Sequence, residues 1–360
     1  MIRYYATKLS YSLLVLLGVS TLLSIIFFAF LNKDDKAIYE MTGQNTSKVE
    51  IERIKKEFYL NQPVAAQVAF YLNDLLPLSF HSSDSIRMIY FNPDNYHGFR
   101  ILNLSNSFGL YIKVPYLRRS YQNRMRVDEI LLQTLPNTVV LALAAMLVAT
   151  IGGIFLGIIA SLNFGKWPDK FLLFFSTLGV SFPSFFVAIL ASWLFGFAWH
   201  EYTGLSPWGN LFEMDDYTGE KHLAWKNLIL PAFTLGIRPL SVIMQLSRNN
   251  LNDVLRSDYI RTSRAKGLSL HAVILKHALK NALNPVLTAV SGWLGSLLAG
   301  AVFVEYVFGW KGIGRELVSA LQKMDYPVVM GCILAIASMF VIINIMVDFL
   351  YGLLDPRIRK

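Results

Sequence analysis

Six apolar runs of membrane-spanning length constrain this chain more than any other feature of its sequence. A helix that crosses the hydrocarbon core of a bilayer, about 30 Å thick, needs roughly 20 apolar residues. The following runs meet that requirement: Leu9–Leu31, Leu135–Leu162, Phe171–Trp199, Leu228–Leu246, Asn284–Phe308 and Val328–Leu354. A soluble chain of 360 residues could not easily bury so many uninterrupted runs in its core. The sequence therefore predicts an all-α membrane protein with six transmembrane helices.

Prolines lie at the edges of several runs, where they are expected to end the helices. They are Pro136, Pro168, Pro231, Pro285, Pro327 and Pro356. The fourth run also contains Arg238-Pro239, which we expect to interrupt its helix.

The first run follows Arg3 and Lys8 and therefore resembles a signal peptide. It is longer than a usual signal core, and no clear small-x-small cleavage site follows it before Asn32. We interpret residues 1–31 as a retained N-terminal transmembrane helix, with cleavage as the alternative.

Basic residues flank the runs asymmetrically. The net charge is +9, but the lysines and arginines form no single patch of the kind that binds nucleic acid. If the N-terminus is cytoplasmic, the inside segments carry Arg3, Lys8, Lys166, Lys170, Arg248, Arg256, Arg261, Arg264, Lys266, Lys276, Lys280, Arg357, Arg359 and Lys360. The outside connection near Glu201–Lys226 is instead mostly acidic. The positive-inside rule thus places both termini in the cytoplasm.

A long polar connection, residues 32–129, lies outside the membrane in this topology. Ser47 and Glu50 have the spacing of a capping box, and apolar residues follow at near-helical spacing, so a short amphipathic helix is expected there. The rest of the connection is expected to be a small folded cap of irregular structure. The chain then divides into a helix (1–31), a cap (32–129) and a five-helix core (130–360).

Several kinds of chemistry lack their sequence signals. There is no G-x-x-x-x-G-K-[ST] loop for ATP, and no H-E-x-x-H or G-x-S-x-G motif. A single cysteine, Cys332, excludes a disulfide framework. The six histidines have no metal-ligand spacing; they are His81, His97, His200, His222, His271 and His277. ATP binding by that route and the common zinc-protease and serine-hydrolase classes therefore lack support, and we expect no metal site.

The connection at residues 248–283 has the most informative pattern. Its first part has helical spacing, with apolar side chains on one side at Val254, Leu255, Tyr259 and Ile260. Gly267 can turn the chain in a left-handed conformation, and Ser269 can cap a second short helix. This helix–turn–helix has an apolar ridge and a basic rim. It can dock in a groove on a partner protein, or anchor to anionic lipid.

Two stretches resemble one transporter family. The first runs Tyr259-Ile260-Arg261-Thr262-Ser263-Arg264-Ala265-Lys266-Gly267-Leu268 and continues through His277 to Pro285; the second runs Val304-Glu305-Tyr306-Val307-Phe308-Gly309-Trp310-Lys311-Gly312-Ile313-Gly314-Arg315. They are similar to the permeases of oligopeptide, dipeptide and nickel ABC importers, of the first-permease type. The chain departs from the family at Lys311, where proline is usual.

The resemblance implies a permease that forms the translocation path for a peptide or a related small solute. Its partners would be a second permease, two ABC ATPase subunits that hold ATP and magnesium, and an extracytoplasmic solute-binding protein, all at the bacterial inner membrane. The ATPase-coupling residues would be Tyr259, Arg261, Thr262, Ser263, Arg264, Ala265, Lys266, Gly267 and Leu268.

Other residues carry weaker signals. Arg238 lies inside the fourth run, where a charge either lines the translocation path or is kept for a structural reason. Gly153 and Gly157 have the small-xxx-small spacing of close helix packing, and Glu305 near a span end is expected to be interfacial or structural.

A membrane-anchored enzyme or receptor with its function in the cap is the competing class. It would need a convergent set of cap residues, and the sequence offers only His81, His97, Asp84 and Asp94.

Overall fold

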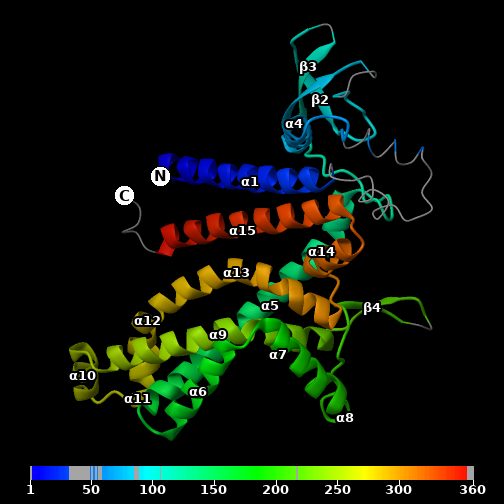
Figure 1. Cartoon of the computed structure of the whole chain (residues 1–360). Helices are drawn as coiled ribbons and strands as arrows, with labels where there is room; N and C mark the ends of the chain where they lie inside the picture. The colour runs from blue at the N-terminus through cyan, green and yellow to red at the C-terminus, as the bar shows by residue number, and fades with distance from the viewer. Residues whose placement is uncertain are drawn as a thin grey trace. The chain divides into compact units, whose positions relative to one another are not determined.

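The computed structural model describes residues 2–31, 49, 52, 55, 59–84, 89–105, 107–215 and 218–354, most of them in helices (Figure 1). The helices are α1 (Ile2–Leu31), α4 (Val64–Leu75), α5 (Val127–Leu162), α6 (Trp167–Ser181), α7 (Ser184–Ala191), η1 (Ser192–Ala198), α8 (His200–Thr203), α9 (Lys226–Leu255), α10 (Asp258–Ala265), α11 (Leu270–Ala272), η2 (Val273–Ala278), α12 (Leu279–Ala282), α13 (Asn284–Phe308), α14 (Ile313–Gln322) and α15 (Tyr326–Leu354). The strands are β1 (Leu78–Ser82), β2 (Gly98–Asn103), β3 (Phe108–Lys113), β4 (Phe212–Met214) and β5 (Lys221–Leu223). The helix expected after Ser47 and the basic C-terminal residues lie outside the described residues.

Five described helices are long and apolar enough to cross a membrane: α1, α5, α9, α13 and α15. A sixth span is formed if α6 and the continuous pair α7–η1 are counted as one. The apolar runs of the sequence therefore predicted where these helices occur.

The third run is not the single straight helix that the sequence suggested. The chain bends by 109° between α6 and the segment that begins at Ser184. Phe182 and Pro183 are extended at the bend, with ψ angles of 137° and 140°. The residue before a proline is pushed out of the helical region by the pyrrolidine ring, which explains why the helix stops at Ser181.

The prediction that prolines end the second and fourth helices was wrong. Pro136 lies inside α5, and Pro231 and Pro239 lie inside α9, which continues to Leu255. Arg238-Pro239 therefore does not interrupt the fourth span. Helices in apolar surroundings tolerate proline because neighbouring groups satisfy the freed carbonyls.

The chain forms two compact units. Among the described residues, the first lies within Met1–Gln133 and Glu316–Ser338, and the second comprises Thr134–Arg315 and the part of α15 after Ser338. In the first unit, α1, α4 and the start of α15 share a small apolar core, whose fully or mostly buried members are Phe27, Phe28, Val68, Tyr71, Met330 and Leu334.

The sequence suggested a cap of irregular structure, but the described part of the cap has regular secondary structure. It contains α4 and a three-stranded antiparallel sheet of order β1-β3-β2. The exposed face of the sheet is apolar, at Leu78, Phe80, Phe99 and Ile112. The fold class is therefore mostly helical with small sheets outside the spans, and not purely α.

A buried charge cluster joins α4 to the end of β3 and to the segments that contain Tyr96 and Arg118. Arg118 donates to the Asp74 carboxylate at 3.1 Å, and both side chains are less than 5% exposed. Tyr96 donates its hydroxyl to the other carboxylate oxygen at 2.7 Å, and the Lys113 ammonium donates to the Asp74 carbonyl. Because an unpaired buried charge is costly, this cluster fixes the cap as one body.

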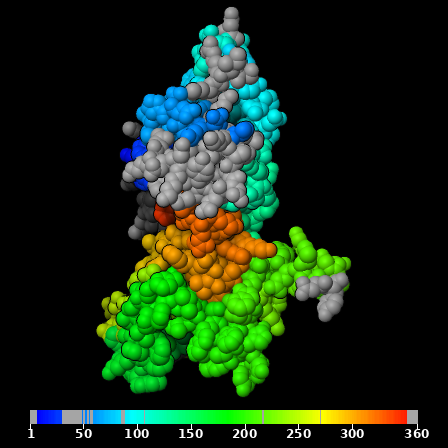
Figure 2. Space-filling model, turned by 45° about the vertical axis from the view of Figure 1, so that its right-hand side comes forward, coloured from blue at the N-terminus to red at the C-terminus, as the bar shows by residue number. Residues whose placement is uncertain are grey.

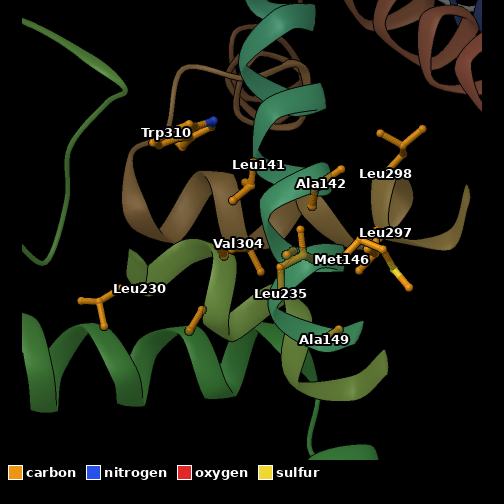
Figure 3. Close-up of a cluster of buried hydrophobic side chains, with 14 of the residues drawn as sticks. Leu141, Ala142, Met146, Ala149, Leu230, Leu235, Leu297, Leu298, Val304 and Trp310 are labelled. Carbon is orange, nitrogen blue, oxygen red and sulfur yellow. The ribbon is translucent and has the colours of Figure 1, made fainter. Parts of the chain in front are cut away.

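The second unit has the larger core, built mainly from α5, α9 and α13, with Ala188 and Ala191 of α7 also buried in it (Figure 3). Leu141, Met146, Leu235 and Leu297 are labelled among the converging apolar side chains in that view. The β4–β5 hairpin projects from this unit (Figures 1 and 2). The core thus lies where these four helices meet.

Glycines allow α5 and α9 to approach closely. A Cβ atom at Gly157 would lie 2.5 Å from the Ser247 Cβ and 2.8 Å from the Met244 carbonyl oxygen, and one at Gly153 would lie 2.7 Å from Ile243. The small-xxx-small pattern therefore serves packing between two helices of the same chain.

Candidate functional site

The connection between α9 and α13 projects as a compact arm of short helices (Figure 1). After α9, the chain enters α10 and then reaches Gly267, whose φ of +80° is left-handed. The Ser269 hydroxyl oxygen accepts a hydrogen bond from the Ala272 backbone N–H at 3.4 Å, at the start of the second helical part. The helix–turn–helix that the sequence predicted, including its glycine turn, is confirmed.

The apolar ridge of this arm is used mostly inside the chain. Ile260 and Val273 are fully buried in a cluster with Leu251 of α9, which Ile158 of α5 also joins. In addition, Asn281 donates its side-chain amide to the Tyr259 hydroxyl at 3.0 Å and so ties α10 to α12. The ridge therefore fastens the arm to α9. The sequence suggested that the whole ridge could dock on a partner, but most of it is already buried inside this chain.

The residues predicted to couple to an ATPase lie together on the outer side of the arm. Eight of the nine are exposed, and Ser263 is half-buried; the exposed ones are Tyr259, Arg261, Thr262, Arg264, Ala265, Lys266, Gly267 and Leu268. Arg261 and Asp258 form only a loose pair at 3.6 Å, with both side chains largely in solvent. The three basic side chains are therefore available to a partner.

Arg238 is an exposed residue on a helix that is otherwise largely covered. The apolar window of α9 is 56% buried, against 22–33% for the other four long spans. Within the described residues, the Arg238 side chain has no hydrogen-bond or ion-pair partner. Among the five long spans, α9 has the largest buried share, and an unpaired cation on such a helix is a candidate for contact with a solute or with another subunit.

Glu305 is a buried hub that the sequence only marked as interfacial or structural. Its Oε1 accepts the Thr138 hydroxyl at 2.7 Å, and its Oε2 accepts the Gly314 and Arg315 backbone N–H groups at 2.7 and 3.3 Å. The Thr138 hydroxyl oxygen accepts the Ile313 N–H at 2.9 Å. The first N–H groups of α14, which have no partner within the helix, are thereby satisfied.

Close approach to Glu305 explains the glycines that follow it. A Cβ atom at Gly312 would overlap the Glu305 carboxylate, and one at Gly314 would overlap the Val302 backbone. Lys311 also has a role that proline could not fill, because its N–H donates to the Asn210 side chain at 2.8 Å. The glycine spacing after Glu305 was the available sequence signal for this hub.

The cap residues considered for an enzyme have structural surroundings. His81 is fully buried between Phe91, Tyr96 and Tyr111, with ring centroids 4.6 to 5.7 Å away. His97 is exposed and lies 3.0 Å from the Arg126 guanidinium. No group of three or more metal-ligating side chains occurs in the part of the chain that the structure describes.

Comparison with known proteins shows which family the chain resembles. The family model described as "Binding-protein-dependent transport system inner membrane component" matches residues 153–360. The "Dipeptide transport system permease protein DppB" of Alkalihalophilus pseudofirmus is 39% identical over 269 residues, which are 70% of this chain and 80% of that protein. The "Di/tripeptide transport system permease protein DppB" of Pseudomonas aeruginosa is 41% identical over 256 residues, 68% and 76% of the two chains.

A solved structure described as "Inward facing conformations of the MetNI methionine ABC transporter" matches with a TM-score of 0.47 and 15% identity, over 63% of this chain and 95% of that one. The spans define a multi-pass membrane protein. The chain belongs to the family of binding-protein-dependent transport system inner membrane components.

Proposed function

We propose that this chain is the permease subunit of an ATP-driven peptide importer and forms the path by which the peptide crosses the membrane. The observation that carries the proposal is the identity of 39% and 41% with two proteins named as dipeptide and di/tripeptide permeases, over about two thirds of the chain. The glycine-turned basic arm at the end of α9 supports it.

The proposed topology has six crossings, with α6 and α7–η1 together forming the third. Both termini and the α9–α13 arm lie in the cytoplasm, where the basic residues gather, and the cap between α1 and α5 lies outside. The bent third crossing supports this count because its two halves together are apolar and long enough for one span.

The arm is the proposed docking site for an ATPase subunit. Residues 259–268 would enter a groove on that partner, with Arg261, Arg264 and Lys266 at the rim. ATP and magnesium belong to the ATPase subunits, so this chain supplies no catalytic residue and binds no cofactor. A second permease and an extracytoplasmic solute-binding protein complete the importer.

Arg238 is proposed to line the translocation path. Lipid is a poor environment for a charge without a partner, whereas an aqueous path is not. The large covered share of α9 supports this placement, since a helix surrounded by other helices has little surface for lipid.

Co-purification tests the docking proposal. The chain would be expressed at the inner membrane with its ATPase subunits, as wild type and as Gly267→Pro and Arg264→Glu. Gly267 needs a positive φ that proline cannot adopt, so we expect this variant to insert normally but to lose the ATPase and peptide uptake. Lys221→Glu is the matched control, an exposed basic residue on β5. Normal ATPase recovery and uptake in both arm variants would contradict the proposal.

A further inference from the structure

A buried ion pair joins α6 to α9. The Arg248 Nε donates to one Asp169 carboxylate oxygen at 2.5 Å, and the second guanidinium contact to the other oxygen is 2.7 Å. The two side chains are 12% and 1% exposed. The same carboxylate accepts the Gly165 N–H at 2.8 Å, so it also fixes the turn between α5 and α6.

An aromatic side chain in that turn extends the junction. The Phe164 ring lies 4.5 Å from the Arg248 guanidinium carbon and 5.5 Å from that of Arg256, which is the residue directly after α9. Such cation–π contacts favour a fixed stacking geometry. The α5–α6 turn therefore contacts one arginine near the C-terminal end of α9 and a second arginine directly after that helix.

The junction continues along the two antiparallel helices. Seven residues after Asp169, the Ser176 hydroxyl donates to the Ser241 carbonyl at 2.9 Å and accepts from the Gln245 amide at 2.9 Å. α6 then ends at Ser181, directly before the 109° bend. A displacement of α9 would thus be carried along α6 to the bend.

The same end of α9 carries the arm. Leu251, three residues after Arg248, packs in the cluster that holds Ile260 and Val273. The ion pair and this cluster are therefore about one helical turn apart on α9. Along α9, Arg248 lies closer to the arm than Ser241 and Gln245, which contact Ser176. A movement of the arm would therefore act on the ion pair first.

We propose that Asp169 and Arg248 are positioning residues that transmit motion of the arm, through α9, to α6 and its bend. The inference rests on the proposed function, in which an ATPase moves the arm. A buried bidentate pair keeps its two helices in one register because separating them leaves both charges unpaired. Without it, α6 and α9 keep only neutral hydrogen bonds and packing, which allow the two helices to slip.

The test uses the complete importer in proteoliposomes, with ATP hydrolysis and peptide uptake measured on the same preparation. Arg248→Lys keeps the charge but loses the bidentate geometry, and Asp169→Asn keeps the shape but loses the charge. Both variants should assemble with the ATPases and hydrolyse ATP, while the peptide imported per ATP falls about tenfold. Exchanging the two residues, Asp169→Arg with Arg248→Asp, should restore part of the ratio.

The matched control is Lys170→Gln, which changes an exposed charge next to Asp169 and should leave the ratio unchanged. An unchanged ratio in both single variants, with wild-type import intact, would overturn this inference alone. A parallel loss of assembly, hydrolysis and uptake in both would mark the pair as merely structural and also overturn it. A wild-type complex that imports no peptide overturns the proposed function and this inference with it.

Discussion

Single polar side chains in this protein are placed where they satisfy several groups at once. Glu305 accepts one hydroxyl and two backbone N–H groups, and Asp169 accepts one guanidinium and one backbone N–H. A carboxylate has enough acceptor sites for three donors, so it can remain buried in an apolar helix. Arg238 has no such partners among the described residues, which sets it apart from both.

Glu305→Gln tests the hub. The amide oxygen can still accept the Gly314 and Arg315 N–H groups, but the NH2 group then faces the Thr138 hydroxyl, which loses its acceptor. We therefore expect a loss of about 1–3 kcal/mol in unfolding free energy. Thermal unfolding of the purified chain in detergent measures the change. Glu316→Gln, a half-exposed acid in the next helix, serves as the control. Equal unfolding temperatures for the two variants would contradict the assigned role.

We predict that His81 makes the stability of the cap depend on pH. Burial, and then the nearby Lys113 charge, lower the pKa of His81 to about 4, although Asp74 opposes the shift. In the unfolded chain, a histidine binds a proton below about pH 6.5, whereas folded His81 stays neutral until about pH 4. The contribution of His81 to cap stability is therefore complete above about pH 6.5 and is lost as the pH falls toward 4. The loss is on the order of 2–3 kcal/mol.

Protease sensitivity of the protein in nanodiscs, between pH 7 and about pH 4, measures how readily the cap unfolds. His81→Phe removes the titrating group and keeps a ring against Tyr96 and Tyr111. Its cap should lose less stability over this range than the wild-type cap. Identical pH profiles for the two proteins would show that His81 does not cause the dependence.

Arg238 should affect transport more than folding. Because the side chain is exposed on α9, Arg238→Ala should leave inserted protein and ATPase binding unchanged while peptide uptake falls several-fold. Arg238→Lys keeps the charge and should retain more uptake than Ala. The measurement is peptide uptake together with the amount of inserted protein for both variants. If Arg238 had only a structural role, the amount of inserted protein would fall together with uptake.

At the scale of elements, the sequence predicted what depends on nearby residues and missed what depends on distant ones. The apolar runs located the spans, and the glycine at 267 located the turn of the arm, since both signals are local. Proline alone does not locate a break: Pro183 follows the end of α6 at the bend, whereas the prolines inside α5 and α9 leave those helices unbroken. The Asp169–Arg248 pair joins positions 79 residues apart, and no local pattern marks such a contact.

Helix packing can be tested at two glycines. Gly157→Ala should lower stability by about 1–3 kcal/mol, because the added methyl group overlaps α9. Gly292→Ala, in α13, meets nothing within 4 Å and should be neutral or slightly stabilising, since alanine favours the helix. Thermal unfolding of both variants decides the comparison. A larger loss at Gly292 would contradict the α5–α9 contact.

At the scale of the whole molecule, the chain combines a core of packed spans, a folded cap and a basic arm, and holds no metal-ligand cluster in its described residues. This division fits a subunit that moves a solute while other subunits supply energy and substrate. Membership in the permease family agrees with it.

Peptide uptake by the reconstituted importer tests the role of this chain most directly. Proteoliposomes would contain the ATPase subunits and the second permease, with or without this chain, and would receive a labelled dipeptide on the solute-binding protein. We predict ATP-dependent accumulation only when this chain is present, and its loss with Gly267→Pro. Equal accumulation without this chain, or none with it in an assembled complex that hydrolyses ATP, would contradict its role as the peptide permease.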